Sequence, residues 1–186
     1  MSEHEIFTRT AIYVRSGIAV ELSDPENADI RLSDIVGALA SINRYTGHGG
    51  AVGRHYSVAA HTLNLLALAP HGASAEEMLY LALHDASEAY LGDVSGPLKH
   101  LLPDYRALEA RWQKAIYDHF GLDNFSPPEW IQRLDKDIVF SEMRMLFGRA
   151  VPENAPAFDL SWPGGDPPRE AAALRFLVES FLQAML

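Results

Sequence analysis

The chain contains no cysteine, which excludes disulfides, thiolate zinc sites and cysteine nucleophiles. Any metal site must therefore use histidine, carboxylate and water. Positive charge is also scarce, because 15 Lys and Arg residues face 25 Asp and Glu residues, for a formal net charge of −10. A field of this sign repels the backbone of polymeric nucleic acid. A small phosphorylated substrate stays compatible with it, provided that a local cation or metal receives the phosphate.

Long apolar runs are missing as well. No stretch approaches the roughly 18 residues that a membrane span requires. The N-terminal segment MSEHEIFTRT lacks the basic start and apolar core of a secretion signal. We therefore expect a soluble, cytoplasmic protein without a membrane partner. The apolar share of 48% and the charged share of 22% are typical of globular proteins, and the length of 186 residues predicts a single domain over 1–186.

The hydrophobic pattern predicts an all-α bundle that follows a short β-hairpin. Apolar residues alternate on both sides of Ser16-Gly17, which predicts the hairpin over about 9–24. Helical spacing then predicts about six helices, with Ser33 or Asp34 capping the first. Their expected ranges are 33–42, 57–69, 74–91, 104–121, 128–150 and 168–186. The helical core thus covers about 32–150, and a loop over 151–167 leads to the C-terminal helix.

Polar residues interrupt two of the apolar helices. His84, Asp85 and Glu88 follow a run of apolar residues in the helix predicted over 74–91, and His61 shares a helix face with apolar neighbours. Burying a carboxylate is unfavourable unless it is paired or binds a metal. Two explanations stay open at this point: the imidazoles and carboxylates satisfy one another in a core, or they hold a metal ion.

The helix predicted over 128–150 offers two further acids, and a helical wheel separates them. Asp135 and Glu142 are only about 20° apart around the axis and share the apolar face. Asp137 instead shares a face with Arg133 and Arg144. We therefore predict that Asp135 faces the core and that Asp137 lies on the surface.

In the order His61, His84-Asp85 and Asp135, these residues match the H…HD…D signature of the HD-domain metal-dependent phosphohydrolases. The chain resembles the small bacterial members that include the 5′-deoxynucleotidases. The resemblance covers roughly 32–149, and its most specific segments are YSVAAH at 56–61, HDASE at 84–88, GD at 92–93 and PLK at 97–99. It implies an HD-domain helical bundle in which His61, His84, Asp85 and Asp135 are the metal ligands.

Two imidazoles and two carboxylates leave two positions of an octahedron for water and a phosphate oxygen. Such a set suits one divalent transition metal ion, Mn²⁺, Co²⁺, Fe²⁺ or Ni²⁺, better than a closed tetrahedral zinc site; Zn²⁺ and Mg²⁺ are further candidates. The ion would polarise the phosphoryl group and lower the pKa of bound water. Glu88 and Asp93 are then the candidate catalytic residues, with their roles interchangeable on spacing alone, and Asp93 could instead be a turn residue.

The candidate substrate-binding residues are Arg44, Tyr45 and Lys99. By the resemblance Arg44 is a phosphate clamp, since a guanidinium binds phosphate oxygens bidentately; without it, Arg44 would be an ordinary mobile surface residue. The deoxynucleotidases have tryptophan where this chain has Tyr45, which leaves base and sugar selectivity open. His48 and His55 flank a glycine-rich stretch, and we favour solvated loop residues over a second metal site.

The predicted function is that of a divalent-metal-dependent phosphohydrolase, most specifically a nucleoside 5′-monophosphate phosphomonoesterase that releases inorganic phosphate. The alternatives are a phosphodiesterase or pyrophosphohydrolase of a signalling nucleotide, and a non-catalytic module that binds metal or nucleotide. The expected partner is a small phosphorylated molecule. The resemblance also suggests a homodimer, for which the apolar residues of the last helix leave surface.

Overall fold

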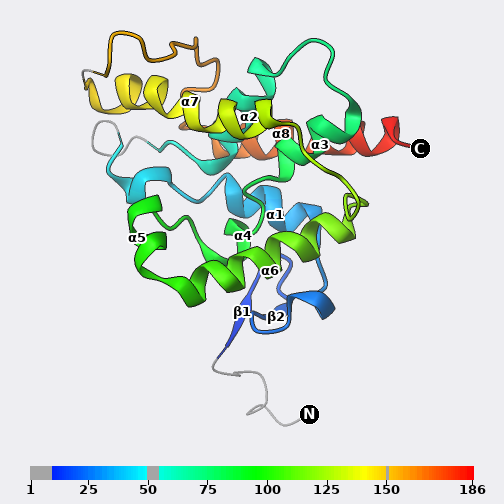
Figure 1. Cartoon of the computed structure of the whole chain (residues 1–186). Coiled ribbons are helices and arrows are strands. Elements are labelled where there is room, and N and C mark those ends of the chain that lie inside the picture. The colour runs from blue at the N-terminus through cyan, green and yellow to red at the C-terminus, as the bar shows by residue number, and fades with distance from the viewer. Residues whose placement is uncertain (1–9, 50–54, 150) are drawn as a thin grey trace.

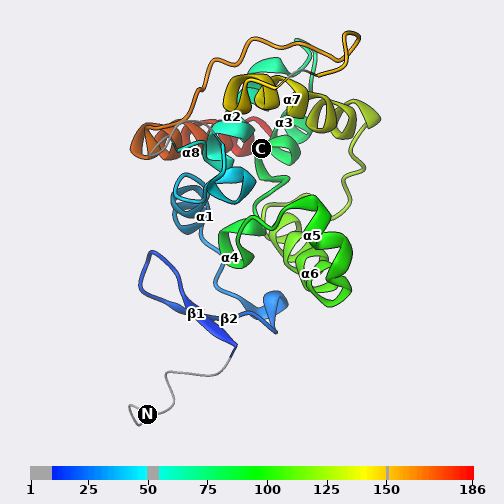
Figure 2. The same cartoon turned by 90° about the vertical axis from the view of Figure 1, so that its left-hand side faces the viewer.

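The computed structural model describes residues 10–49, 55–149 and 151–186 and shows a mostly helical protein (Figure 1). The strands β1 (Ala11–Tyr13) and β2 (Ala19–Glu21) form an antiparallel sheet, which lies at one end of the helices (Figure 2). The all-α class with an N-terminal hairpin is thus confirmed. The helices are α1 (Leu32–Leu39), α2 (Val58–Leu68), α3 (Ala75–Leu83), α4 (Glu88–Leu91), α5 (Gly96–Leu101), α6 (Pro103–His119), α7 (Glu129–Phe147) and α8 (Pro167–Ala184).

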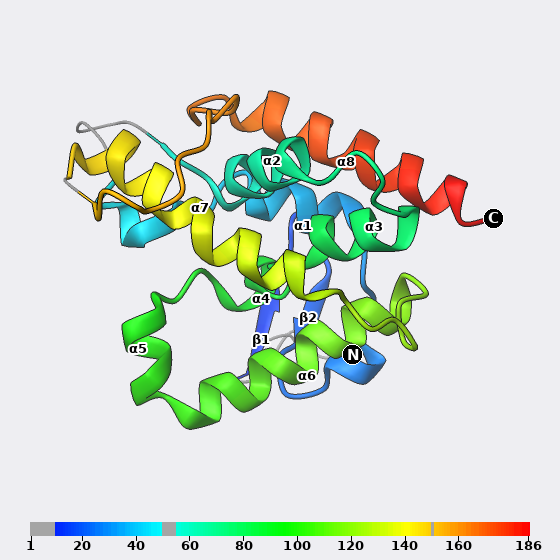
Figure 3. The ribbon, with the colours of Figure 1, turned by 45° about the horizontal axis from the view of Figure 1, so that its top comes forward.

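Helix α2 forms the centre of the molecule. Every residue from Val58 to Leu66 is buried, since α8, α3 and α7 all pack against this helix. Figure 3 shows α8 along one side of α2 and α7 along the other. None of the described helices is both long and apolar enough to cross a lipid bilayer.

The start of α2 is fixed by a buried hydrogen-bond chain. The Ser57 hydroxyl accepts from the Ala60 amide at 2.9 Å and donates to the Glu170 carboxylate of α8 at 2.5 Å. A serine in this position satisfies one of the free amides of the first helical turn. The same contact joins α2 to α8, and it therefore holds His61, one turn further along, in a defined place.

The prediction of one unbroken helix over 74–91 is wrong. It begins at the expected capping box of Ser74 and Glu77, but α3 ends at Leu83, and α4 begins only at Glu88. The cause lies on another helix. The Gln113 side chain of α6 donates to the Leu83 carbonyl at 2.7 Å and accepts from the Ser87 amide at 3.1 Å. These bonds replace helical ones, so the backbone can turn at 84–87.

The predicted start of the first helix is also wrong. Helix α1 begins at Leu32, and neither Ser33 nor Asp34 caps it. The buried Asp34 carboxylate instead accepts from the amide and the hydroxyl of Ser16, both at 2.7 Å. This tertiary contact ties the hairpin turn to α1.

A further helix lies between the ranges expected at 74–91 and 104–121. Helix α5 covers Gly96–Leu101, where the sequence pattern predicted no helix.

Candidate metal centre

Three of the predicted ligands form a compact cluster. His61 of α2, His84 at the end of α3 and Asp135 of α7 each place a potential ligand atom within 4.8 Å of the others. The distance between His61 Nε2 and Asp135 Oδ1 is 3.2 Å. Asp85 joins them, because its Oδ2 lies 3.2 Å from His84 Nε2 and 3.8 Å from His61 Nε2. The cluster has the composition and spacing to hold a metal ion.

Contacts at the Nδ1 atoms, which face away from the cluster, orient both imidazole rings. His61 Nδ1 lies 2.7 Å from Glu142 Oε1, and His84 Nδ1 lies 2.8 Å from the Leu81 carbonyl oxygen. These acceptors favour the tautomer with hydrogen on Nδ1 and a lone pair on Nε2. Among the described atoms, both buried Nε2 atoms have no hydrogen-bond partner. Each Nε2 therefore faces the cluster and can bind a metal when it carries no proton.

The charges within the cluster complement one another. Burial would lower the pKa of His84, but the Asp85 carboxylate outweighs this effect and raises that pKa to about 9. Burial would raise the pKa of Asp85, but His84, His61 and Arg44 bring it well below its usual range. Without metal, a proton on His84 thus balances part of the carboxylate charge. A divalent cation would take the place of this proton.

Glu142 is a central residue to which the sequence pattern assigned no role. Its side chain is completely buried, and Oε1 contacts His61 Nδ1 at 2.7 Å and accepts from the Tyr56 hydroxyl at 2.8 Å. The Tyr45 hydroxyl donates to the other oxygen. Burial would raise the pKa of Glu142, but His61 and Arg44 bring it down to about 2. A buried, charged carboxylate therefore fixes the first histidine.

The interpretation of Arg44 as a mobile surface residue is wrong. Its side chain is only 14% exposed, with Nη1 3.4 Å from Asp85 Oδ2 and Nη2 3.6 Å from Glu142 Oε2. Its Nε is buried, and no described group accepts from it. The next two residues, Tyr45 and Thr46, have φ angles of 56° and 54°. Such backbone is strained for a β-branched residue and is common at functional sites.

The two candidate catalytic acids lie near each other. Glu88 is 4% exposed, its Oε2 has no described partner, and its Oε1 lies 3.4 Å from Lys99 Nζ. Burial and the charges of Asp85 and Asp93 raise the pKa of Glu88 to about 9.

Lys99 also contacts Glu109 at 2.6 Å. Lys99 therefore already has two carboxylate partners, which makes it a weaker candidate for phosphate binding than Arg44.

A cavity of about 550 Å³ adjoins the cluster. Its described lining residues are Arg44, Tyr45, Thr46, Asp93, Ser95, Gly96, Pro97, Val139, Met143 and Phe147. Gly92 directly precedes Asp93 and has a φ of 78°, a conformation that glycine adopts without strain. The chain can therefore end α4 there and turn toward the cavity. Two of the predicted substrate-binding residues, Arg44 and Tyr45, and one predicted catalytic acid, Asp93, thus line the same cavity.

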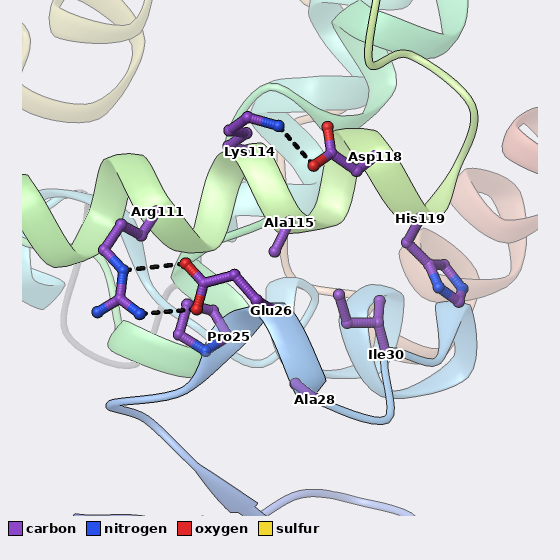
Figure 4. Close-up of a pocket in the computed structure, with 9 residues that line it drawn as sticks. All are labelled: Pro25, Glu26, Ala28, Ile30, Arg111, Lys114, Ala115, Asp118 and His119. Carbon is purple, nitrogen blue, oxygen red and sulfur yellow. Dashed lines mark hydrogen bonds and ion pairs between the residues drawn. The ribbon is translucent and has the colours of Figure 1, made fainter.

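Another cavity, of about 410 Å³, lies between α6 and the segment after β2 (Figure 4). Arg111 in its wall bonds Glu26 at 3.0 and 2.7 Å, and Lys114 contacts Asp118 at 2.5 Å. Both cations are therefore already paired with carboxylates. This cavity is a poorer candidate for a phosphorylated ligand than the one beside Arg44.

Three other candidates from the sequence, His48, His55 and Asp137, lie outside the cluster found among the described residues. His55 Nε2 lies 2.9 Å from the Ala40 carbonyl oxygen, and His48 is exposed after a 3₁₀ turn. The cluster of candidate metal ligands found among the described residues includes neither histidine. Asp137 is partly buried beside a different cavity, with Trp130 and Arg133. The helical wheel thus placed Asp135 beside the histidines. Its prediction of burial is wrong, since both acids are partly buried and the Asp135 side chain is 42% exposed.

No protein-family model matches the chain. The chain is similar to the uncharacterized protein YfdR of Escherichia coli (strain K12), with 38% identity over 94 residues, which cover 50% of this chain and 49% of YfdR. It is also similar to an uncharacterized protein of Rhodobacter capsulatus, with 37% identity over 117 residues, covering 60% and 59% of the two chains. The match thus spans 49% of one relative and 59% of the other, and neither name states an activity.

Proposed function

We propose that the protein is a divalent-metal-dependent phosphohydrolase of the HD-domain type, and that it releases inorganic phosphate from a nucleoside 5′-monophosphate. The observation that carries this proposal is the pair of buried Nε2 atoms of His61 and His84, which face Asp85 and Asp135 without a described hydrogen-bond partner. Two neutral imidazoles and two carboxylates suit Mn²⁺, Co²⁺, Fe²⁺ or Ni²⁺. When bound, such an ion polarises a phosphoryl group and lowers the pKa of water.

Arg44 is placed to bind the phosphate. Its Nη atoms lie 3.4 and 3.6 Å from Asp85 and Glu142, which is longer than a strong charged hydrogen bond. The guanidinium is therefore held near the cluster without being fully used there. A phosphate that enters can take two of its N–H donors, and Asp85 and Glu142 keep the guanidinium oriented for that contact.

Glu88 and Asp93 have distinct places in the proposed reaction. The free Oε2 of Glu88 can hold the attacking water and accept its proton, because a bound dication lowers the pKa of a nearby carboxyl group. Asp93 lines the cavity into which the alcohol product would leave. Burial raises the pKa of Asp93, which favours this residue as the proton donor to the leaving oxygen.

The test measures phosphate release from nucleoside monophosphates, nucleoside diphosphates and cyclic nucleotides with added Mn²⁺ or Co²⁺. We expect turnover of the monophosphates. We also expect Glu88→Gln to keep the metal and to lose about 10²- to 10⁴-fold in kcat, the usual contribution of a general base. Glu109→Gln is the matched control, since it removes the other carboxylate partner of Lys99 and should change kcat by less than about threefold.

Other outcomes would contradict this function in distinct ways. Turnover of cyclic nucleotides or diphosphates alone would indicate a phosphodiesterase or pyrophosphohydrolase. Binding of metal and nucleotide without any turnover would indicate a binding module. Loss of metal from the Glu88→Gln variant would make Glu88 a ligand rather than a base.

A further inference from the structure

The cavity beside the cluster continues along an inclined row of side chains on α7. Asp135, Val139, Met143 and Phe147 follow one another at intervals of four residues. Neighbours at this spacing are about 40° apart around the axis, so the four form a ridge that turns by about 120° from end to end. Asp135 belongs to the cluster of candidate metal ligands, and the other three residues line the cavity. Because a helix rises about 1.5 Å per residue, Met143 lies about 12 Å along the axis from Asp135. The ridge thus leads from the candidate metal ligands, where the phosphate would bind, to an apolar end of the cavity.

The apolar end of the cavity is built from rings. The Tyr45 and Phe147 rings meet edge to face, with centroids 5.5 Å apart and an interplanar angle of 85°. The Arg44 guanidinium lies 5.5 Å from the centre of the Tyr45 ring. Tyr45 therefore stands between the cation and the apolar wall. Its hydroxyl is held by Glu142, which fixes the ring in this place.

Charge is confined to the end that adjoins the cluster. Among the described lining residues, Arg44 and Asp93 are the ones with charge, while Val139, Met143 and Phe147 offer no polar group. A sugar phosphate would leave this apolar wall without contacts. A flat ring would cover it, and the volume of about 550 Å³ is within the range of small-molecule sites.

We propose that Val139, Met143 and Phe147 form a leaving-group subsite that selects phosphomonoesters with a planar, largely apolar ring such as a nucleobase. This inference rests on the proposed function for the phosphate end alone. Met143 is the central specificity-determining residue, because a thioether contacts the faces and edges of rings favourably. Removing one such contact lowers affinity by roughly two- to tenfold.

The first experiment compares kcat/KM for deoxyadenosine 5′-monophosphate and 2-deoxyribose 5-phosphate, which share the phosphate and the sugar. We expect the wild-type protein to favour the nucleotide by at least about tenfold. Met143→Ala should reduce this ratio by about two- to tenfold. Met145→Ala is the matched control, a partly buried methionine of the same helix that packs against Tyr56, Ala60 and Leu146 and lines a different cavity. It should leave the ratio unchanged.

The second experiment does not depend on turnover. Calorimetry measures binding of deoxyadenosine, which has the ring and lacks the phosphate, and Met143→Ala should weaken it while Met145→Ala does not. Equal kcat/KM for the two phosphates would overturn the subsite and leave the proposed function standing. No turnover of any phosphomonoester, together with nucleoside binding that depends on Met143, would refute the function and retain the subsite. Absent nucleoside binding, or equal weakening by both variants, would overturn the subsite.

Discussion

Replacing Glu142 with glutamine isolates the contribution of one buried charge to metal binding. The carboxylate accepts from His61 Nδ1, from the Tyr56 hydroxyl and from the Tyr45 hydroxyl. An amide of the same shape has a single acceptor oxygen, and its NH₂ group can only donate. In Glu142→Gln at least one of the three donors therefore loses its partner, and Arg44 loses a neighbouring negative charge.

The expected size follows from these contacts. Removing the group that orients a ligating histidine typically weakens metal binding by about 10- to 100-fold, which corresponds to roughly 1.4–2.8 kcal/mol. A buried donor without a partner also destabilises the fold by about 1–3 kcal/mol. Glu142→Gln should thus lower both the metal affinity and the free energy of unfolding.

Glu170→Gln separates these two effects. Glu170 is as deeply buried, at 1% exposure, and it accepts from the Ser57 hydroxyl and the Asp166 amide at the other side of α2. Its replacement should lower the melting temperature by a similar amount and leave metal affinity within about twofold of wild type. Metal affinity would be measured by competition with a chromophoric chelator. Equal metal affinity in the wild-type and Glu142→Gln proteins, or equal loss in both variants, would refute the positioning role of Glu142.

Two further predictions concern stability. The pKa of His84 is raised from 6.5 to about 9 and that of Glu88 from 4.5 to about 9. Between these values the folded state binds more protons than the unfolded state, so stability falls as pH rises. The melting temperature of chelator-treated protein should therefore fall between pH 6.5 and 9, and Mn²⁺ should abolish the fall. A rise in the chelator-treated protein would contradict this. Thr46→Asn should raise the free energy of unfolding by about 0.5–1 kcal/mol, because asparagine tolerates the left-handed backbone at φ 54° better than threonine does. A denaturant titration measures this change, and an unchanged or lower midpoint would contradict the prediction.

Local patterns predicted the parts of the fold that local forces determine. Helices α2, α7 and α8 lie within about three residues of their expected ranges, because their apolar residues recur at the helical period and Ser57 and Asp166 cap two of them. The wheel of α7 also placed Asp135 rather than Asp137 beside the histidines. A periodic pattern states which side of a helix faces its neighbours. That sufficed to choose between two acids, although both are partly buried.

Tertiary contacts determined what the patterns missed. The turn after Leu83 contains neither glycine nor proline, so no local signal could end α3 there; the cause is Gln113, 30 residues further along. The burial of Arg44 depends likewise on Asp85 and Glu142, which are distant in sequence. The role of Glu142 required knowing which histidine its helix face meets.

The dependence of the α3–α4 turn on Gln113 bears on the order in which the site can assemble. During synthesis His61, His84 and Asp85 leave the ribosome well before Gln113, and a chain that ends before α6 lacks the side chain that bonds Leu83 and Ser87. Its segment 74–91 is then free to continue as a regular helix, in which neighbouring side chains point about 100° apart. The nascent chain would thus lack a formed site until α6 has docked and α7 has supplied Asp135. Tight metal binding would then indicate that the helices of the core are in place.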